Sequence, residues 1–474
     1  MNPLRKLKRA LLRSLLILAS VAFFAAVPSA FSQTIFTPGD LVVSTYGVGG
    51  GYLNGTWQST SVDGVPTTIS LEEFTPSGAL VATHTLPVTD SGSNFGIVGE
   101  YGSSSEGNLQ LSGDGQSLLI AGYQADASIA GTGSPGGLGY YNGNPDGVDA
   151  LAQSNASDVP RLVAVVGANG VANVSTQFNN IYNQNNPRSV WSANGATLYV
   201  SGQGNGTADQ GVFTVQAGSN TVTGSPAPTP ISSNTGLSTR IVSAYNGNLY
   251  YSTDVKSVAT GIFQYSGIPT SAATATAILP ANGTTGNLTS GTVNYSPDGF
   301  YFANSTTLYV ADTGSPKNKA TGDGGIQKWT FSGGAWHLDY TLTPANFIHA
   351  YNDKTSVLTD GEVGFESITG MVVNGTVDLY AVSYTIGDAD QDGLYAVTDS
   401  LSALINPGDS FTELATAPGV GDNSTFTTTG GSVFKSVAFA PITVPEPGTY
   451  ALIFGAVGGA LAMFYRRRQT TIAK

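Results

Sequence analysis

Residues 107–123 read GNLQLSGDGQSLLIAGY, two largely apolar runs joined through an Asp-Gly pair. Asp-Gly and Asn-Gly between apolar runs are strong short-range signals for a hairpin. The reason is steric: a type I′ turn needs positive φ at both central residues, which Gly adopts freely and Asp or Asn tolerate. The stretch therefore predicts a strand, a turn at Asp114-Gly115 and a second strand.

The same hairpin pattern recurs four more times, with Asn-Gly at the turn in three copies and Asp-Gly in one. The copies span Pro187–Ser201, Arg240–Ser252, Thr292–Asp312 and Ser367–Val382. A third apolar strand follows each of the five hairpins, and a fourth strand can be assigned after most of them. The expected third strands are Leu162–Val166, Val212–Val215, Ile262–Tyr265, Gln327–Phe331 and Leu394–Val397. Four-stranded units that recur at roughly 50 to 80 residues are typical of β-propeller blades.

The two chain ends predict one further unit. Val433–Ala440 has the pattern of a first strand with no partner after it, whereas Leu41–Thr45, Ile69–Phe74 and Leu80–His84 have the pattern of second, third and fourth strands. Pairing these segments would complete a sixth blade, close the ring without a disulfide and hide sheet edges.

The body, residues 33–442, thus resembles six- and seven-bladed β-propellers that carry a Ser-Pro-Asp-Gly hairpin signature, intact here at Ser296–Gly299. We expect an all-β propeller with six blades. A seventh blade within residues 87–106 or 345–362 stays open, and a pair of β-sandwiches is the alternative architecture.

Composition limits the partners of this body. Residues 33–444 contain 9 basic and 30 acidic residues, a net charge of −21. Such a field repels nucleic acid and anionic membranes, so we expect no nucleic-acid partner. The chain has no Cys, which excludes disulfides, thiol catalysis and Cys-ligated metals.

The last part of the chain, residues 443–474, combines a short polar motif, an apolar segment and a basic end. The polar motif is Pro445, Glu446 and Pro447, and the basic stop is Arg466, Arg467 and Arg468. As a helix, the uncharged segment Thr449–Tyr465 would span roughly 25 Å, near the lower limit for a bilayer crossing. The arginines predict that this end faces the cytoplasm and that the body lies on the other side.

This tail resembles the PEP-CTERM sorting domain, because motif, helix and Arg cluster occur in the same order. The resemblance implies a Gram-negative host that makes extracellular polysaccharide. It also implies cleavage near Pro445–Pro447 by an exosortase, a membrane cysteine protease. The chain would be a substrate of that system rather than the protease. An ordinary tail anchor in the inner membrane is the alternative.

The N-terminal residues 1–32 have the pattern of a secretory signal peptide. A positive region that contains Arg5 and Lys6 precedes an apolar run, Leu15–Ala26, and small residues at Ala30 and Ser32 mark cleavage by signal peptidase. We therefore expect an exported protein that passes through the inner membrane to the cell surface or the extracellular space. A retained N-terminal anchor is the alternative.

One acidic segment has the spacing of a calcium loop. The candidate ligands are Asp388, Asp390, Asp392 and Asp399, at positions 1, 3, 5 and 12 of an EF-hand-type loop, with Gly393 at position 6. Alternate side chains of a tight turn can surround a hard cation with oxygens, so Ca²⁺ is the candidate cofactor. The flanks are strands rather than helices, which would place Asp399 beyond a strand. An acidic turn between strands is the alternative.

Groups suited to catalysis are sparse. The three histidines, His84, His337 and His349, lie in different units without metal-ligand spacing, so we expect neither a His-based triad nor a zinc site. Asp360, Glu362 and Glu366 cluster before a predicted inner strand and could line a channel mouth, but we assign no catalytic residue.

Two classes of function follow. The first is a non-enzymatic cell-envelope or matrix protein that binds exopolysaccharide or surface partners. The second is an extracellular propeller hydrolase, lactonase or lyase that acts on glycan. We expect the first class, because the repeats are poor in acid and His residues.

Overall fold

The computed structural model of the chain describes residues 35–53, 56–58, 66–100, 103, 105–124, 151–232, 237–255, 259–279, 296–314, 324–347, 362–385, 392–417 and 431–443. Both sequence-predicted export segments lie outside these ranges. None of the helical segments among the described residues is long and apolar enough to cross a bilayer. The expected membrane helix, residues 449–465, is not among them.

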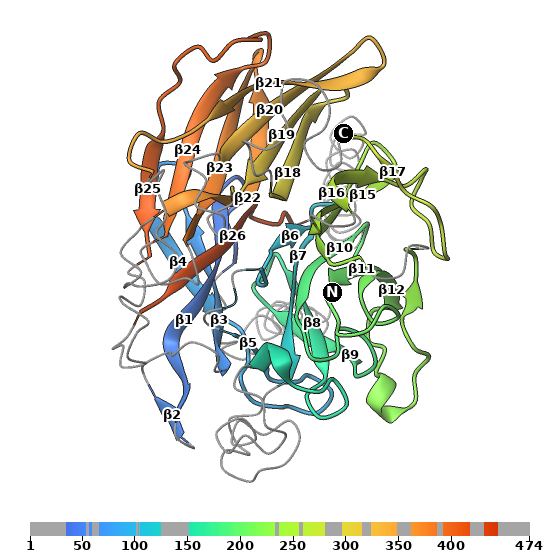
Figure 1. The fold of residues 1–474 in the computed structure, drawn as a ribbon. Coiled ribbons are helices and arrows are strands. Elements are labelled where there is room, and N and C mark those ends of the chain that lie inside the picture. Colours follow the sequence, from blue (N-terminus) through green and yellow to red (C-terminus); the bar gives the residue numbers. More distant parts are fainter. Residues whose placement is uncertain are drawn as a thin grey trace, which may run out of the picture. The chain divides into compact units, whose positions relative to one another are not determined.

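Four separate four-stranded antiparallel sheets, each with its strands in chain order, occupy the described residues from 187 to 416 (Figure 1). The first contains β10 (Pro187–Ser192), β11 (Thr197–Gly202), β12 (Gly211–Gln216) and β13 (Thr229–Pro230). The second contains β14 (Thr239–Tyr245), β15 (Asn248–Val255), β16 (Ala259–Gln264) and β17 (Thr276–Ala277). The third contains β18 (Pro297–Asn304), β19 (Thr307–Asp312), β20 (Gly325–Ser332) and β21 (Ala335–Leu342). The fourth contains β22 (Glu362–Val373), β23 (Thr376–Thr385), β24 (Gly393–Ser400) and β25 (Thr412–Thr416).

A fifth, ten-stranded sheet contains the remaining strands and joins two four-stranded units. One unit has β26 (Val433–Phe439), β1 (Leu41–Leu53), β3 (Pro66–Phe74) and β4 (Leu80–Thr85), paired in that order. The other has β6 (Gln110–Leu111), β7 (Ser117–Gln124), β8 (Arg161–Gly167) and β9 (Ala172–Phe178). Strand β5 (Ile97–Glu100) pairs with β3 and β7 and bridges the units, and β2 (Thr56–Gln58) extends β1. Two short 3₁₀ turns, Leu151–Gln153 and Thr221–Thr223, complete the described elements.

The predicted pairing of the chain ends is confirmed. Strand β26 pairs antiparallel with β1, from Leu41 opposite Phe439 to Tyr46 opposite Val433. The pairing is extended by the Ala440 N–H, which donates to the Asp40 carbonyl at 2.8 Å. The predicted third strands are also confirmed, since each lies within or at the end of β8, β12, β16, β20 or β24.

The hairpin turns differ from the expectation in their geometry. Asn246-Gly247 and Asn374-Gly375 have positive φ at both residues, as a type I′ turn requires. At Asp114-Gly115 and Asn194-Gly195 only Gly has a positive φ. There a serine at the start of the loop, Ser112 or Ser192, accepts hydrogen bonds from backbone N–H groups of the loop and supports a longer turn.

The placement of one predicted turn was wrong. Pro297, Asp298 and Gly299 do not form a hairpin turn but begin strand β18. Proline is tolerated at the first position of a strand, where its missing N–H costs no ladder bond. The turn lies instead at Ser305-Thr306, where the Asn304 side chain accepts from the Thr306 N–H at 2.8 Å.

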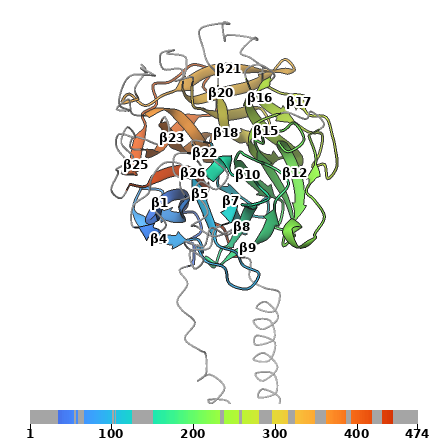
Figure 2. The same cartoon turned by 60° about the horizontal axis from the view of Figure 1, so that its bottom comes forward.

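Hydrophobic contacts link each four-stranded unit to the next. Six clusters of buried apolar side chains are formed by the described residues, and each cluster lies between two consecutive units. Strand alternation makes this possible: Tyr250 packs toward the β18–β21 sheet, whereas its neighbour Tyr251 packs toward the β10–β13 sheet. The sixth cluster joins Val382 of β23 to Val43 of β1 and Val437 of β26. The last unit therefore packs on the first, and the described residues adopt a β-propeller-like, all-β fold (Figure 2).

Small polar side chains connect the first strands of different units. The Ser189 hydroxyl donates to the Asn108 side-chain oxygen at 3.1 Å, and the Asn108 amide donates to Ser436 at 3.2 Å. Ser436 and Ser367 share a hydrogen bond of 2.8 Å between their hydroxyls. We call these four buried residues the serine-asparagine cluster. At Gly299, a Cβ would come within 3.0 Å of the Ser367 Cα, so β18 and β22 can approach closely only because no side chain intervenes.

We predict that removal of residues 433–442 weakens cooperative thermal unfolding and increases aggregation. The deletion exposes an edge of β1 and removes part of two hydrophobic clusters. Calorimetry and light scattering would measure both effects. Melting that is unchanged by the deletion would contradict the role of β26.

A pair of substitutions provides a matched control for the deletion. Val437→Asp places a charge at a 2% exposed position, with an expected cost of roughly 3–5 kcal/mol. Ile442→Asp changes a 45% exposed position beyond the strand and should leave the melting temperature almost unaltered.

Candidate functional site

The first strands of five units carry charged residues, and these strands contact one another from unit to unit. Apart from Glu362 at the start of β22, the charged residues are Arg188 in β10, Arg240 in β14, Asp298 in β18, Glu366 in β22 and Lys435 in β26. A small residue follows in four of the five: Ser189, Gly299, Ser367 and Ser436. Four of the five charged residues therefore lie one position before a small residue. We call the five charged residues the inner charged set.

Arg240 is the centre of one half of this set. Its guanidinium binds Asp254 at 2.6 Å and also binds Asp298. Burial alone would raise the pKa of Asp254, but Arg240 outweighs burial and holds that pKa well below its usual range. Burial dominates at the less exposed Asp298 and raises its pKa despite the same partner. The triad is therefore an internal ion pair rather than a free acid–base couple.

Arg188 is held by uncharged partners. It donates to the Gln203 side-chain oxygen at 2.6 Å and to the Ser238 hydroxyl at 2.8 Å. Burial and the neighbouring Arg240 lower the pKa of Arg188 to about 10, so it stays charged at neutral pH. The hydrogen bond from Arg188 to Ser238 links β10 to the start of the β14–β17 sheet.

A second polar group surrounds Glu106. The Tyr123 hydroxyl donates to Glu106 at 2.8 Å, and the Glu100 N–H donates to the same carboxyl group. Burial, and then the nearby Glu100 carboxylate, raise the pKa of Glu106 to about 8. The Lys435 ammonium, which donates to the Ser103 carbonyl at 2.8 Å, opposes this shift only in part.

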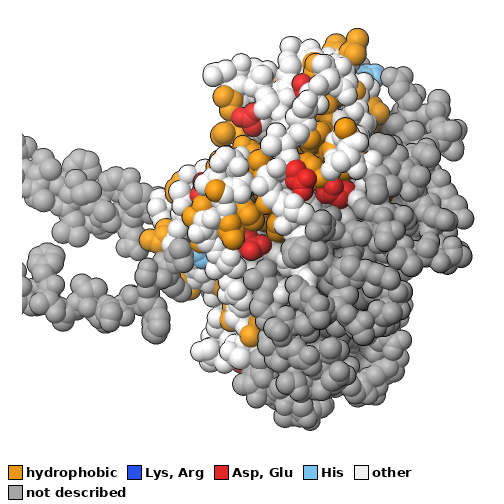
Figure 3. Space-filling view, turned by 90° about the vertical axis from the view of Figure 1, so that its left-hand side faces the viewer, with side chains coloured by type: hydrophobic (Ala, Val, Ile, Leu, Met, Phe, Trp, Pro, Cys, Tyr) orange, Lys and Arg blue, Asp and Glu red, His pale blue; other side chains and the backbone are white. Residues whose placement is uncertain are grey.

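The described basic side chains all point inward. Arg161, Arg188, Lys328 and Lys435 are at most 6% exposed, and the Arg240 side chain is 14% exposed. Lys328 illustrates the pattern, since its ammonium lies 3.0 Å from Asp399 and donates to the Ala403 carbonyl at 2.9 Å. Figure 3 shows acidic but no basic side chains among the coloured atoms of one face. The described surface is therefore acidic or neutral.

The candidate calcium ligands are only partly described. Asp388 and Asp390 lie outside the described residues. Asp392 is buried directly before β24, whereas Asp399 lies near the far end of that strand and accepts from Tyr309 and Tyr340. Seven residues of strand separate the two by roughly 23 Å, so the structure does not bring Asp399 to Asp392. No group of three or more metal-ligating side chains occurs among the described residues.

The other residues singled out from sequence do not converge. His84 packs on Phe36 and lies 3.6 Å from Glu73, and burial lowers the pKa of His84. His337 is exposed on β21. Glu362 accepts from the Ser383 hydroxyl at 2.6 Å and from the Tyr395 hydroxyl, separately from the buried Glu366. His349, Asp360, the sorting motif Pro445–Pro447 and the basic stop Arg466–Arg468 lie outside the described residues.

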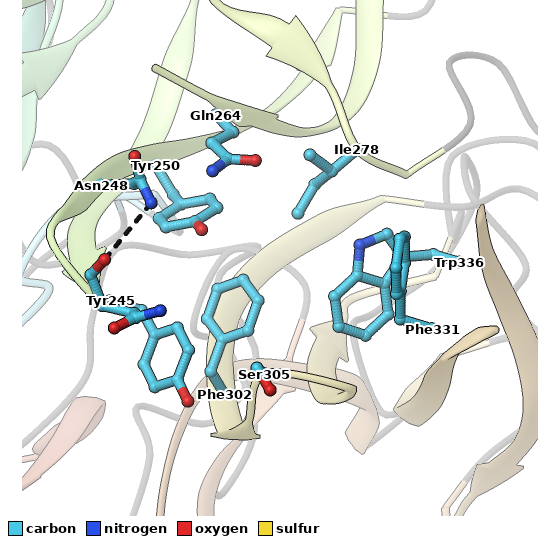
Figure 4. Close-up of a pocket in the computed structure, with 10 residues that line it drawn as sticks. Tyr245, Asn248, Tyr250, Gln264, Ile278, Phe302, Ser305, Phe331 and Trp336 are labelled. Carbon is cyan, nitrogen blue, oxygen red and sulfur yellow. Dashed lines mark hydrogen bonds between the residues drawn. The ribbon is translucent and has the colours of Figure 1, made fainter. Parts of the chain in front are cut away.

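A pocket that sequence reasoning missed lies between the β14–β17 and β18–β21 sheets. It has a volume of about 220 Å³. Its lining comprises Tyr245, Asn246, Asn248, Tyr250, Gln264, Ile278, Phe302, Ser305, Phe331 and Trp336. None of these ten side chains carries a charge at neutral pH. We call this site the aromatic pocket (Figure 4).

Hairpin geometry positions the aromatic pocket. The type I′ turn at Asn246-Gly247 ends β14 at Tyr245 and starts β15 at Asn248, and alternation then places Tyr250 on the same face as Asn248. Gln264 lies opposite Tyr250 on β16. From the next sheet, β18 contributes Phe302, while Phe331 and Trp336 are opposite each other on β20 and β21.

The aromatic rings contact one another across the sheet boundary. Tyr245 stacks on Phe302 with ring centres 4.7 Å apart and an angle of 10°. Trp336 meets Phe302 edge-on at 6.0 Å and Phe331 at 5.4 Å. Trp336 and Phe331 lie across the pocket from Tyr245 and Tyr250 (Figure 4). The only local signal in the sequence was the Tyr-Asn-Gly-Asn segment at residues 245–248, read there as a turn.

Comparisons with known proteins give fold-level likenesses only. No protein-family model and no curated protein matches the chain. A gluconolactonase from Xanthomonas campestris aligns with 70% of this chain and 86% of its own, at 12% identity and a TM-score of 0.32. The β-propeller domain of the trilobed protease from Pyrococcus furiosus aligns with 80% of this chain and 96% of its own, at 8% identity and a TM-score of 0.30. A polysaccharide lyase that acts on ulvan aligns with 82% and 93%, at 10% identity and a TM-score of 0.32. At these scores no activity transfers to this chain.

We predict that Arg240→Met lowers the unfolding free energy by roughly 3–5 kcal/mol at pH 8, because Asp254 and Asp298 lose their shared cation. Without Arg240, burial raises the folded-state pKa of both carboxyl groups above the unfolded value. The folded variant then binds more protons than the unfolded variant, so its stability falls as pH rises. The loss should therefore be smaller at pH 5 than at pH 8 in denaturant titrations.

The double variant Arg240→Met with Asp298→Asn is the matched control. Removal of one carboxylate should restore part of the stability at pH 8 and flatten the pH dependence. An equal loss for Arg240→Met at both pH values would mean that the ion pairs do not determine it.

Proposed function

We propose that this chain is an exported, non-enzymatic protein of the cell envelope or extracellular matrix, sorted by an exosortase in a Gram-negative host. One observation carries the proposal: the last backbone hydrogen bond among the described residues, from the Ile442 N–H to the Gly115 carbonyl, comes three residues before Pro445. Cleavage near Pro445–Pro447 would leave β26 and its pairing with β1 intact. The sorting signal proposed from the sequence therefore begins after the residues that pair β26 with β1.

We propose further that the body is a six-bladed propeller closed by its own chain ends. The six hydrophobic clusters between consecutive units, together with the β26–β1 pairing, support six blades. Such a body displays its hairpins on a rigid scaffold, which suits the binding of exopolysaccharide or of other surface partners.

A non-enzymatic role agrees with the contacts that the inner charged set makes within the protein. Arg240 pairs with Asp298 and with Asp254 of β15, and Arg188 and Lys435 donate to oxygen atoms of neighbouring residues. The competing proposal is an extracellular hydrolase, lactonase or lyase for glycan, and turnover of a lactone or polysaccharide by the secreted protein would favour it.

We propose that the loop that contains Asp388, Asp390 and Asp392 binds Ca²⁺. The burial of Asp392 directly before β24 agrees with a role for that carboxylate inside a loop rather than in solvent. Asp399 is better assigned to its ion pair with Lys328.

We predict that the protein recovered outside the cell starts near Gln33 and ends near Pro445. Signal peptidase and exosortase would remove the two export segments. Intact-mass and peptide mass spectrometry of the secreted fraction would locate both ends. Replacement of Pro445, Glu446 and Pro447 by Ala should leave the N-terminal processing unchanged but retain tail peptides in the membrane fraction. Peptides from residues 450–465 in mature secreted wild-type protein would refute exosortase sorting.

A further inference from the structure

The aromatic pocket contains both partly exposed and buried aromatic rings. Phe331 is 39% exposed, and Trp336 and Tyr245 are half-buried. By contrast, Phe302 and Tyr250 beneath them belong to the hydrophobic cluster between the sheets. The buried rings thus support the outer rings, which present apolar surface to solvent inside a concave site.

Stacking is the first requirement that the pocket meets for a sugar ring. One face of a pyranose is lined by C–H groups and packs on an aromatic face, as other apolar groups do. Trp336 and Phe331 form one wall, and Tyr245 and Tyr250 form the opposite wall (Figure 4). A volume of about 220 Å³ accommodates a sugar ring, and the lining includes two exposed residues of hairpin turns, Asn246 and Ser305.

Hydroxyl recognition is the second requirement. Gln264 points between Tyr250 and Ile278 toward the pocket (Figure 4). Gln264 and Ser305 both belong to the pocket lining, where their side chains supply an amide and a hydroxyl group. Asn248 is fixed, since its side-chain oxygen accepts from the Gly267 N–H at 2.8 Å and its amide donates to the Asn246 carbonyl at 3.3 Å. Amide and hydroxyl groups of this kind match the hydroxyls of a sugar without requiring charge.

Charge selects the class of sugar. The lining contains no Lys or Arg to bind a carboxylate, and every basic side chain in the described part of the chain is turned inward. The body has a net charge of −21, from 9 basic and 30 acidic residues in 33–444. Uronic acids and sulfated sugars would therefore enter an uncharged site within a negative field, which opposes their binding.

We propose that the aromatic pocket is a binding site for uncharged hexopyranose units of a glycan chain. The proposal gives a ligand class to the binding role proposed above and rests on it. Trp336 and Phe331 stack on the sugar face, Gln264 and Ser305 hydrogen-bond its hydroxyls, and acidic sugars are excluded.

The test is calorimetric titration of the processed, secreted protein with neutral hexasaccharides of glucose, mannose and galactose, and with an oligogalacturonate of the same length. We expect at least one neutral probe to bind and the acidic probe to bind at least tenfold more weakly. Trp336→Ala should weaken neutral binding about tenfold, and Trp336→Phe should restore most of it. His337→Ala is the matched control, because alternation places this exposed neighbour on the other face of β21.

Gln264→Ala keeps the proposal testable if Trp336→Ala fails to fold, since it removes the amide from the pocket lining and leaves the backbone pairing of β16 with β15 in place. The proposal is overturned if no neutral probe binds, if the acidic probe binds equally well, or if Gln264→Ala and a folded Trp336→Ala both leave affinity unchanged. Mass spectrometry of the same samples separates the two proposals. Correctly processed protein that binds no sugar refutes the ligand class alone, whereas an unprocessed tail refutes the sorting proposal.

Discussion

The pairing of β26 with β1 is the interaction on which the remaining structure depends. Each four-stranded unit buries apolar side chains on both of its faces, so each needs a neighbour on both sides. A linear array would leave the first and last units with one exposed apolar face. Because β26 supplies a strand to the first unit and packs against the last, the chain ends provide the contacts that an array lacks. In a chain without Cys, this topology replaces the covalent closure of a disulfide.

Polar groups then organise the centre that this closure creates. The serine-asparagine cluster satisfies the small buried hydroxyls and the amide from one unit to the next. The inner charged set lies one position away and concentrates the few basic residues inside. Arg240 pairs with Asp254 and Asp298, and Lys328 of β20 pairs with Asp399 of β24 outside this set. The described surface is therefore acidic or neutral. Because the described Lys and Arg side chains are turned inward, the described surface opposes the approach of anionic ligands.

Local signals explain what could be predicted from the sequence. Hairpins, third strands and the terminal pairing could be predicted from the alternation of apolar residues and from Asn-Gly turns. Both signals depend on only a few adjacent residues. The turn at Pro297–Gly299 was misplaced because Pro at a strand start and Pro in a turn have the same local sequence. Contacts with distant residues, such as that of Asp298 with Arg240, distinguish the two cases. The aromatic pocket could not be predicted because its lining residues come from two sheets. They are spread along the sequence from Tyr245 to Trp336, so no local pattern brings them together. The inner charged set could have been found, since alignment of the first strands places Arg188-Ser189, Glu366-Ser367 and Lys435-Ser436 in register.

Native-state hydrogen exchange of the processed protein tests the central role of the terminal pairing most directly. We predict that the amides of β26 and β1 exchange only through global unfolding, with the same free energy of opening as the amides of β10 and β11. The contrary result is exchange of the β26 amides at a much lower free energy while β10 and β11 stay protected. In that case the chain end would be an appended strand, and closure of the fold would need a different explanation.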